Sequence, residues 1–250
     1  MKIALITGGS RGLGKSMATH VAARGTGVVL TYNSHPEEAE AVAAGIKKAG
    51  GKAAALKLNI ADTTTFDDFA KDLQATLQKE WGRQTFDYLV NNAGTAQRTP
   101  IKDTTEEQFD QLLQVHCKGP FFLTQKLMSV MEDGGHIINI SSGLTRFTNT
   151  AGVATYAAMK GAMEVYTMYF AREYAHRKIR VNTVAPGAID TQFAGPNGRS
   201  EEQKKMLADM TALGRCGEAD DIGLLVAGLL SEDSRWVNAQ RIEASGGMHI

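Results

Sequence analysis

Tyr156 and Lys160, a tyrosine and a lysine four residues apart, form the part of this sequence best suited to chemistry. Residues with this spacing share one face of a helix, so the two side chains would point the same way. A free phenol titrates at about pH 10, and a nearby ammonium lowers its pKa by stabilising the phenolate. The pair therefore predicts a general acid and base, with Tyr156 transferring a proton to or from an oxygen and Lys160 tuning it.

The same spacing occurs a second time, and the surrounding sequence separates the two pairs. Tyr174 and Lys178 lie near the end of a predicted helix, in the charged stretch AREYAHRK of residues 171–178, which is typical of an exposed surface. Tyr156 and Lys160 follow a predicted strand and its loop, where parallel sheets place their ligands. We therefore assign the chemistry to Tyr156 and Lys160.

Two serines before that loop could polarise a carbonyl oxygen. Ser141 and Ser142 end the predicted strand in the stretch INISS. A serine hydroxyl can donate a hydrogen bond to the oxygen that Tyr156 would protonate. Serines at the end of a strand also form turns and cap helices, so a structural role stays open at both positions. From the residues alone, the structural role is favoured for both serines.

A glycine-rich turn after the first predicted strand has the pattern of a phosphate-binding loop. Residues 7–14 read TGGSRGLG and lead into a predicted helix. Glycines let the backbone approach a pyrophosphate, and the helix N-terminus offers free N–H groups and partial positive charge. Strand, turn and helix in this order are the context that dinucleotide binding requires. The residues expected to contact the dinucleotide here are Gly8, Ser10, Arg11, Gly12, Leu13 and Gly14.

The end of the second predicted strand indicates which dinucleotide is bound. NAD-binding folds usually carry Asp or Glu about 20 residues after the glycines, where it holds the ribose 2′-hydroxyl. That position is Ser34 here, beside Asn33, while Glu37 and Glu38 fall in the first turn of the next predicted helix. Arg11 can instead offer a cation to a 2′-phosphate. The pattern favours NADP(H) over NAD(H), with Asn33 and Ser34 near the ribose.

Apolar segments of strand length alternate with helical patterns along the chain. The predicted strands cover residues 2–7, 27–32, 52–58, 86–91, 136–141, 179–185 and 239–243. The predicted helices run to about residue 24 after the turn, then over about 36–49, 63–80, 106–131, 152–176, 200–212 and 219–230. This alternation is typical of a parallel sheet covered on both faces. We expect an α/β fold: one Rossmann-type doubly wound domain over residues 1–250, with a seven-stranded parallel sheet and helices on both faces.

The composition argues against several classes of partner. The 250 residues carry 27 basic and 27 acidic side chains, a balance that does not favour nucleic acid or an anionic membrane. The apolar stretches are too short for a signal-peptide core or a membrane helix. Cys117 and Cys216 lie far apart and outside any cluster of metal ligands. We therefore expect free thiols, no metal site and a cytoplasmic location.

Taken together, these features resemble the short-chain dehydrogenase/reductase family over essentially the full chain. The matching segments are the glycine turn, NNAG at residues 91–94, the Ser–Tyr–Lys set, and the Pro-Gly and Thr of residues 186–191. The resemblance implies that Tyr156 and Lys160 face the nicotinamide and that Lys160 also holds the ribose hydroxyls. The further cofactor contacts that it implies are Asn59, Ile60, Asn92, Ala93, Gly94, Pro186, Gly187, Ile189 and Thr191.

Three positions depart from the usual family pattern. Members usually carry an aspartate after the third strand, where this chain has Asn59, whose amide oxygen can still accept a hydrogen bond. The serine usually precedes the tyrosine by thirteen residues, which is Gly143, so Ser142 requires one inserted loop residue. We still expect Ser142 to be the catalytic serine that the resemblance implies, with Ser141 as the alternative. His116 stands where many members have a helix asparagine whose backbone carbonyl holds a water. A second acid/base role for His116 is a further hypothesis, although lone helical histidines are more often structural.

The resemblance implies an oxidoreductase that transfers hydride from NADPH to a ketone or aldehyde, similar to reductases of 3-oxoacyl carriers and of small ketones or sugars. Loops 95–100, 144–155 and 193–206 would shape the substrate pocket. Phe147, Phe193 and Met206 are candidate apolar walls, although ordinary packing explains them as well. The alternatives are an NAD-dependent alcohol dehydrogenase and a non-catalytic dinucleotide-binding sensor.

The resemblance also implies a homo-oligomer, a dimer or tetramer. The predicted helix 106–131 and the helix that carries Tyr166, Tyr169 and Phe170 could supply two-fold interfaces. Core packing explains these aromatic residues equally well.

Overall fold

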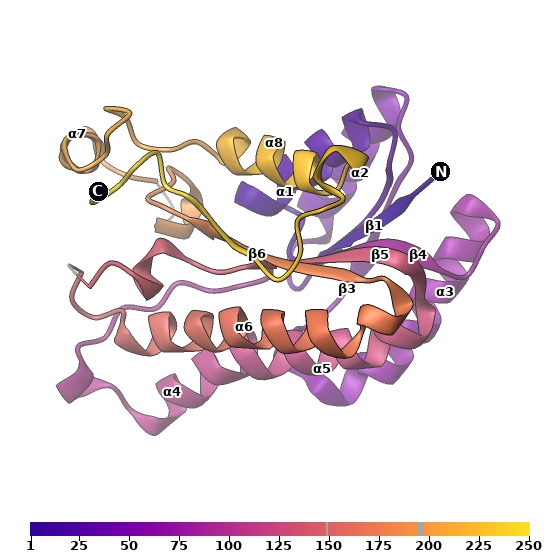
Figure 1. Ribbon diagram of the computed structural model, residues 1–250, viewed down its shortest axis with the longest axis horizontal. Helices are drawn as coiled ribbons and strands as arrows, with labels where there is room; N and C mark the ends of the chain where they lie inside the picture. The colour runs from indigo at the N-terminus through magenta and orange to yellow at the C-terminus, as the bar shows by residue number, and fades with distance from the viewer. Residues whose placement is uncertain (149, 195–197) are drawn as a thin grey trace.

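Seven parallel strands form one sheet in the order β3-β2-β1-β4-β5-β6-β7 (Figure 1). The computed structural model describes residues 1–148, 150–194 and 198–250. The strands are β1 Ile3–Ile6, β2 Gly27–Tyr32, β3 Ala53–Lys57, β4 Phe86–Asn91, β5 Met131–Ile140, β6 Arg180–Pro186 and β7 Arg241–Ala244. Every neighbouring pair is parallel. The predicted seven-stranded, Rossmann-type architecture is confirmed.

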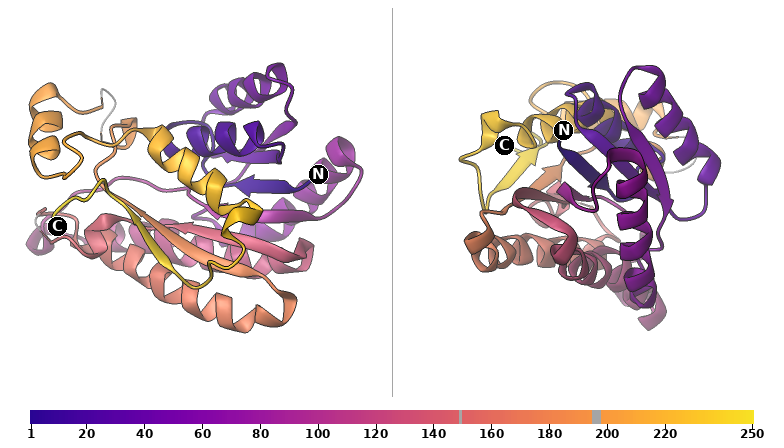
Figure 2. Two further views of the ribbon diagram at one scale, coloured as in Figure 1. Left: turned by 45° about the horizontal axis from the view of Figure 1, so that its top comes forward. Right: turned by 90° about the vertical axis from the view of Figure 1, so that its right-hand side faces the viewer.

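Helices cover both faces of the sheet (Figures 1 and 2). One face carries α1 (Gly12–Ala23), α2 (Pro36–Lys48) and α8 (Ala219–Leu229). The other carries α3 (Phe66–Trp81), α4 (Glu106–Leu113), α5 (Gly119–Leu127) and α6 (Ala154–Glu173). The short α7 (Glu201–Asp209) lies beyond the carboxyl ends of the strands, close to the C-terminus in Figure 1.

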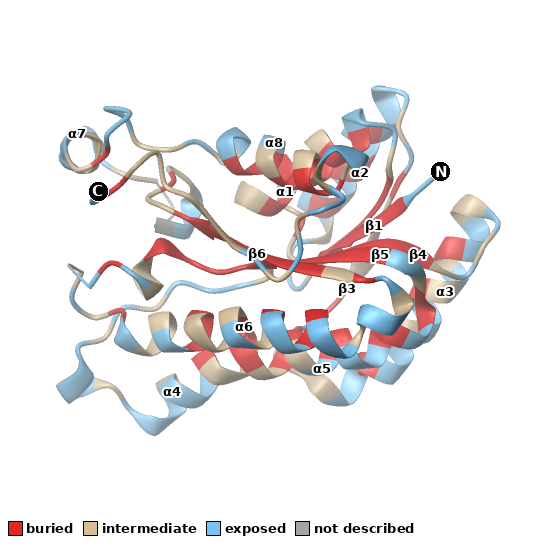
Figure 3. Ribbon diagram, viewed as in Figure 1, coloured by how far each residue is buried: buried red, intermediate tan, exposed pale blue. Residues whose placement is uncertain are grey.

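Two hydrophobic layers hold these helices on the sheet, and alternate strand residues feed each layer. Ala4 and Ile6 of β1 lie in the layer with α1, whereas Ile3 and Leu5 lie in the layer with α3 and α5. Figure 3 shows the buried residues concentrated along the strands and on the helix faces turned toward them. Burial on both faces explains why the strands read as continuous apolar runs.

Local sequence fixes where several helices begin and end. Pro36 occupies the first turn of α2, where its missing N–H costs no helical hydrogen bond. Thr105 caps α4 in a reciprocal capping box with Gln108. The left-handed Gly82 ends α3. Among the described residues, none of these helices is both long and apolar enough to cross a membrane.

The prediction of one continuous helix over residues 106–131 was wrong. The segment is α4, a π-helical turn at Gln114–Lys118, α5 and a 3-10 turn at Met128–Val130. The π turn ends where the chain presses on a neighbouring loop: a Cβ on Gly119 would lie 2.0 Å from the carbonyl oxygen of Ile60. The fifth strand also begins at Met131 rather than at residue 136, with an irregular register against β4.

The carboxyl ends of the strands bring four sequence segments to one edge of the sheet. The strand order reverses between β1 and β4, which is where doubly wound sheets open a crevice for ligands. A Cβ on Gly8, after β1, would lie 2.9 Å from Cα of Ala93, after β4. Ser141 follows β5, and Pro186 ends β6, at the same edge. The residues predicted to bind and react therefore share this edge.

Candidate active site

The glycine turn excludes side chains at Gly8, Gly9 and Gly14, where a Cβ would lie less than 3.0 Å from a neighbouring atom. Gly8 has a φ of +66°, and Gly12, at the start of α1, has a φ of +51°. A Cβ on Gly14 would lie only 2.0 Å from the carbonyl oxygen of Gly8. The turn is also tied to β2, because the N–H of Gly9 donates to the carbonyl of Thr31 at 2.8 Å. Glycine is thus required for this turn to reach the N-terminus of α1.

Asn92 and Ala93 brace the turn from the neighbouring strand. Their backbone N–H groups donate to Oγ1 of Thr7 at 2.9 and 3.0 Å. The side-chain amide of Asn92 donates to the carbonyls of Thr7 and Gly8 at 2.9 and 3.1 Å. Asn92 therefore acts on the shape of the turn, and Gly94 follows it at the exposed edge.

The residues predicted near the adenosine ribose are accessible. Arg11 is the N-cap residue of α1 and is exposed, as are Asn33 and Ser34 beyond the end of β2. Asn59 is exposed as well, and its amide oxygen accepts the N–H of Ala61 at 3.1 Å. Ile60, by contrast, is buried. Arg11, Asn33 and Ser34 are therefore exposed, and their contact with a phosphate-bearing ribose stays a prediction.

The segment after β6 closes the other side of the crevice. Gly187 packs so tightly on Ser245 that a Cβ there would lie 2.7 Å from Cα of Ser245. Ile189 is buried. Thr191 lies beside the glycine turn, since a Cβ on Gly12 would be 3.8 Å from Cβ of Thr191. Thr191 therefore lies against the start of α1, and the cofactor contacts that the resemblance implies for this segment stay a prediction.

Tyr156 and Lys160 both come from the N-terminal half of α6. The Lys160 side chain is buried, with only 5% of the residue exposed, and its Nζ donates to the carbonyl of Ile140 at 2.7 Å. Nζ lies 5.8 Å from the centre of the Tyr156 ring. Ser142 hydrogen-bonds to Tyr156 through its side chain. The structure thus brings the three predicted catalytic residues together at the end of β5.

The electrostatics of this trio differ from the expectation that Lys160 lowers the pKa of Tyr156. Burial raises the pKa of Tyr156 to about 12, and the hydrogen bond with Ser142 opposes that rise. Burial also lowers the pKa of Lys160 to about 8. At neutral pH the protein's own groups therefore hold Tyr156 as a neutral phenol. Lowering its pKa to near neutrality requires a further positive charge beside it, such as an oxidised nicotinamide.

Ser141 and Ser142 differ in their hydrogen-bond partners. Ser141 Oγ donates to Oε1 of Glu164 at 2.6 Å, so its hydroxyl is occupied away from the tyrosine. Ser142 Oγ accepts the N–H of Leu144 at 3.2 Å, which leaves its own proton available for donation. Ser142 is therefore the serine that faces Tyr156, although Gly143 holds the usual family position.

His116 is a buried neutral side chain. Only 1% of the residue is exposed, and burial, with the charge of Lys160, lowers its pKa to about 3. Its Nε2 lies 2.9 Å from the carbonyl oxygen of Thr95, and its ring meets the Tyr156 ring edge-on at 5.0 Å. A Cβ on Gly94 would lie 2.7 Å from its Cε1. This packing favours a structural role for His116 over an acid/base role.

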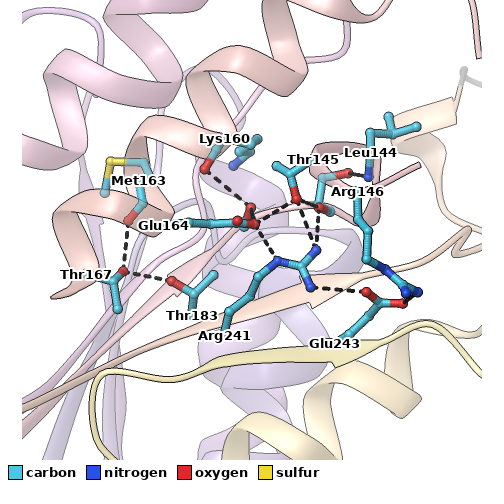
Figure 4. A network of polar contacts seen from close by, with 12 residues as sticks. Leu144, Thr145, Arg146, Lys160, Met163, Glu164, Thr167, Thr183, Arg241 and Glu243 are labelled. Carbon is cyan, nitrogen blue, oxygen red and sulfur yellow. Dashed lines mark hydrogen bonds and ion pairs between the residues drawn. The ribbon is translucent and has the colours of Figure 1, made fainter. Parts of the chain in front are cut away.

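Sequence reasoning missed a chain of buried polar side chains behind Lys160. Asn91 donates to Asn139 at 2.8 Å, and Asn139 donates to Oγ1 of Thr167 at 2.8 Å. Thr167 and Thr183 share a hydrogen bond of 2.7 Å, which Figure 4 includes. These residues link β4, β5, α6 and β6. The only indication in the sequence was the presence of polar residues within otherwise apolar strands.

Two further residues at the site were also missed, Glu164 and Arg241. Glu164 stands one helical turn beyond Lys160 on α6, and Arg241 opens β7. Arg241 Nε donates to Oε1 of Glu164 at 2.8 Å (Figure 4). The spacing of Tyr156, Lys160 and Glu164, four residues at each step, is the sequence pattern that could have revealed Glu164.

The predicted substrate loops meet around Tyr156. The N–H of Thr99 donates to the carbonyl of Gly152 at 2.8 Å, which joins loop 95–100 to loop 144–155. A small cavity opens beside Tyr156, lined by Gln97, Thr99, Thr104, Gln108, Leu112, Gly152 and Thr155. Asn149 and residues 195–197, within the predicted loops, lie outside the described residues.

The candidate apolar walls behave differently from one another. Phe193 is exposed, and its ring centre lies 6.2 Å from that of Tyr156. Met206 of α7 is exposed too. Phe147 is buried against Gly143 and packs 5.2 Å from the ring of His249. Ordinary packing therefore explains Phe147, and Phe193 is the aromatic side chain available beside the phenol.

The arrangement fits a dinucleotide cofactor in the crevice. The turn around Gly8 and Gly14 excludes side chains where phosphates would approach the backbone. Lys160 and Tyr156 lie on α6, and Lys160 is bonded to the last residue of β5 at the same carboxyl edge of the sheet. Cys117 and Cys216 are free thiols, as expected.

Comparisons with known proteins show which family the chain belongs to. A family model described as enoyl-(acyl carrier protein) reductase matches residues 8–249. The hydroxynaphthalene reductase-like protein Arp2 of Metarhizium majus is 37% identical over 257 aligned residues, covering 98% of this chain and 94% of Arp2. The angucycline C-6 ketoreductase LanV, crystallised with NADP, superimposes with a TM-score of 0.93 at 38% identity, covering 99% of this chain and 95% of LanV.

A solved enzyme of Serratia marcescens, itself described as a short-chain dehydrogenase/reductase, gives a TM-score of 0.91 at 31% identity. The match covers 100% of this chain and 98% of the Serratia protein. The family model and the relatives thus match the chain over almost its whole length. The chain belongs to the short-chain dehydrogenase/reductase family of oxidoreductases.

Proposed function

We propose that this chain is a ketoreductase that uses NADPH to reduce a ketone on a fused-ring aromatic substrate. The observation that carries the proposal is the convergence of Ser142, Tyr156 and Lys160 at one end of the dinucleotide crevice. A serine donor, a neutral phenol and a buried ammonium are the groups that carbonyl reduction needs.

The cofactor is NADP(H). LanV was crystallised with bound NADP, and the exposed Arg11, Asn33 and Ser34 offer a cation and hydrogen bonds where a 2′-phosphate would lie. Bound NADPH supplies the hydride. The protein's own task is to hold the carbonyl carbon against it and to provide the proton.

Ser142 would steady the carbonyl oxygen. Because its Oγ already accepts the N–H of Leu144, its hydroxyl proton is directed outward as a donor. Tyr156 would then protonate the same oxygen, since burial keeps its phenol protonated. The Lys160 ammonium, fixed by the carbonyl of Ile140, would stabilise the phenolate left after proton transfer. The resemblance adds a ribose-binding role for Lys160.

Two observations support an aromatic substrate. The name of one relative, hydroxynaphthalene reductase-like protein Arp2, refers to a fused-ring compound, and LanV has been crystallised with NADP and rabelomycin. In this chain the exposed Phe193 ring stands 6.2 Å from the Tyr156 ring. A flat substrate could pack against Phe193 while its carbonyl reaches Tyr156 and Ser142.

The two alternative functions make different predictions. A non-catalytic sensor needs none of the trio, yet all three residues are present and clustered. An alcohol dehydrogenase using NAD would gain from an acidic residue beside the ribose, where this chain has Asn33 and Ser34. Both alternatives can be separated from the proposal by turnover and cofactor preference.

A homo-oligomer is part of the proposal. Tyr169 is 62% exposed on α6, beside the exposed Val165 and Met168, and Phe122 of α5 is exposed as well. Phe170, in contrast, belongs to the core between α6 and the sheet. Light scattering should give a mass above one chain for the wild type and a smaller mass for Tyr169→Asp.

The function is tested by following NADPH oxidation over a panel of substrates, with Tyr156→Phe as the blank. The panel holds fused-ring aromatic ketones, ketoesters, oxoacyl and enoyl thioesters, and sugars. We expect turnover with an aromatic ketone and little with enoyl thioesters. Binding of NADPH without turnover of any carbonyl would instead support the sensor. Turnover only of alcohols with NAD would support the dehydrogenase.

A further inference from the structure

The turn that carries Ser142 is held by an acidic side chain from α6. Glu164 Oε1 accepts the hydroxyl of Ser141 at 2.6 Å and the hydroxyl of Thr145 at 2.9 Å. These two residues flank Ser142 on either side. The Thr145 oxygen also lies 2.9 Å from the carbonyl oxygen of Ser142, so its single hydroxyl proton is shared between Glu164 and that carbonyl. One carboxylate oxygen therefore fixes both sides of the serine.

An arginine on the last strand completes the arrangement, as Figure 4 shows. Arg241 donates through Nε to Oε1 of Glu164 at 2.8 Å and through Nη2 to Oγ1 of Thr145 at 3.0 Å. The same Nη2 lies 3.4 Å from the carbonyl oxygen of Ser142. Nη1 is held by Glu243 at 3.0 Å. The guanidinium thus joins β7 to the turn after β5.

Glu164 also links this turn to the phenol. Tyr156, Lys160 and Glu164 follow one another at intervals of four along α6 and so share one face. Lys160 holds the end of β5 through Ile140, and Glu164 holds the turn that follows. The helix that presents the tyrosine thereby sets the position of the serine as well.

We propose that Glu164 and Arg241 are positioning residues that hold the hydroxyl of Ser142 against Tyr156. They touch neither the phenol nor the crevice, and they act through Ser141, Thr145 and the backbone of Ser142. The inference rests on the proposed ketoreductase function, because its benefit is the alignment of two donors on one carbonyl oxygen.

The contacts suit positioning more than general stability. Glu164 and Arg241 have side chains that are 19% and 26% exposed, and an ion pair at such a site adds little net stability relative to apolar packing. Most of their described hydrogen bonds nevertheless go to three residues of one turn. Loss of either side chain would free that turn while leaving both hydrophobic layers intact.

The test is a cycle of Ser142→Ala, Glu164→Ala and the double variant, measured with the aromatic ketone. We expect Glu164→Ala to lower kcat by about 10- to 100-fold, in the range of a small misplacement of a reacting group. The Kd for NADPH should stay the same. In the Ser142→Ala background the same substitution should lower kcat less than about threefold, because the residue it positions is gone.

A matched control removes another carboxylate in an ion pair. Glu80 pairs with Lys47 at 3.9 Å, next to Trp81, which packs on Gly27 at the amino end of β2. Glu80→Ala should leave kcat unchanged. If Glu164→Ala lowered kcat by the same factor with and without Ser142, the positioning role would be overturned, because the effect would then be a general structural one.

Two gentler variants cover the case in which Glu164→Ala does not fold. Arg241→Met keeps the apolar stem and removes the guanidinium, and Thr145→Val removes the hydroxyl that both residues hold. Each should lower kcat without changing the Kd for NADPH. Glu164→Gln keeps an oxygen acceptor and should retain more activity than Glu164→Ala. Equal kcat values for these variants and wild type would contradict the proposal.

A readout without turnover separates this inference from the proposed function. Crystal structures of the wild type and of Arg241→Met, both with NADP bound, should show Ser142 displaced from Tyr156 only in the variant. An unmoved Ser142 in the variant overturns the positioning role. If wild type reduces no carbonyl but the serine still moves in Arg241→Met, the proposed activity fails while the positioning role stands.

Discussion

The ammonium nitrogen of Lys160 lies 2.7 Å from the carbonyl oxygen of Ile140, the last residue of β5. The lysine is thus buried against a neutral acceptor rather than a carboxylate. Burial lowers its pKa to about 8, so the cation that the tyrosine needs is lost just above neutral pH. The placement of one side chain therefore determines where the enzyme should lose activity.

The first prediction concerns the pH dependence of carbonyl reduction. Lys160 is charged below its pKa of about 8 and neutral above it. We expect kcat/KM for reduction to fall as pH rises through about 8, by roughly tenfold per further pH unit for one titrating group. In Lys160→Arg this fall in kcat/KM should begin at a higher pH, because arginine keeps its charge. The highest kcat/KM of the variant should be lower than that of wild type. If kcat/KM of Lys160→Arg fell at the same pH as that of wild type, the titrating group would be one other than Lys160.

The second prediction concerns cofactor choice. Arg11→Ala should raise the KM for NADPH by about 10- to 100-fold, the scale of a lost charged hydrogen bond. The KM for NADH should change little, because NADH has no 2′-phosphate. Arg24→Ala, an exposed arginine at the other end of α1, is the control. Equal changes for both cofactors would show that Arg11 does not read the 2′-phosphate.

The third prediction concerns the glycine turn. A Cβ at Gly14 would stand 2.0 Å from a backbone oxygen, so Gly14→Ala should open the turn and weaken NADPH binding at least about tenfold. Gly45→Ala in α2 meets nothing within 4 Å and should not weaken binding. Calorimetric titration with NADPH measures both. Normal binding by Gly14→Ala would mean that this turn does not contact the phosphates.

The fourth prediction concerns His116, whose pKa falls to about 3 in the folded protein. The unfolded state then binds one more proton between about pH 3 and 6.5, so folding stability is lost as pH falls through this window. His116→Asn should reduce the slope of unfolding free energy against pH by about 1.4 kcal/mol per pH unit. His136 also has its pKa lowered to about 3, so the unfolding free energy of His116→Asn should still depend on pH over the same window.

The same variant tests the acid/base hypothesis for His116. Because the histidine is neutral above pH 5, His116→Asn should leave the shape of the activity profile between pH 6 and 8 unchanged. Denaturant unfolding at several pH values and initial rates over that range supply the two measurements. A shifted activity profile would restore a proton-transfer role for His116.

Much of the fold followed from local pattern. Strands such as Gly27–Tyr32 were predicted at their observed bounds because they are buried on both faces and end in clear breaks. The start of β5 was missed because Glu132, Asp133, Gly134 and Gly135 show neither apolar alternation nor β propensity. The π turn at Gln114–Lys118 was missed because the apolar spacing of a helix continues through it.

The site was predictable where it depends on short spacings. Tyr156 and Lys160 could be paired from the sequence because a helix fixes their relation. Ser142 was already preferred to Ser141 through the resemblance, but the physical difference between them needed the structure, since it depends on which hydroxyl Glu164 binds. Arg241 and Glu164 are 77 positions apart, and no local pattern predicts that contact. The raised pKa of Tyr156 also could not be foreseen, because it depends on burial, which outweighs the hydrogen bond with Ser142.

The central claim is that Tyr156 donates the proton in carbonyl reduction, and Tyr156→Phe tests it most directly. The variant keeps the ring that packs on His116 and removes only the hydroxyl. With NADPH and the best aromatic ketone, kcat should fall by about 10²- to 10⁴-fold, the usual contribution of a general acid, while the Kd for NADPH stays the same. A kcat within about threefold of wild type would contradict the account, because a residue other than Tyr156 would then supply the proton.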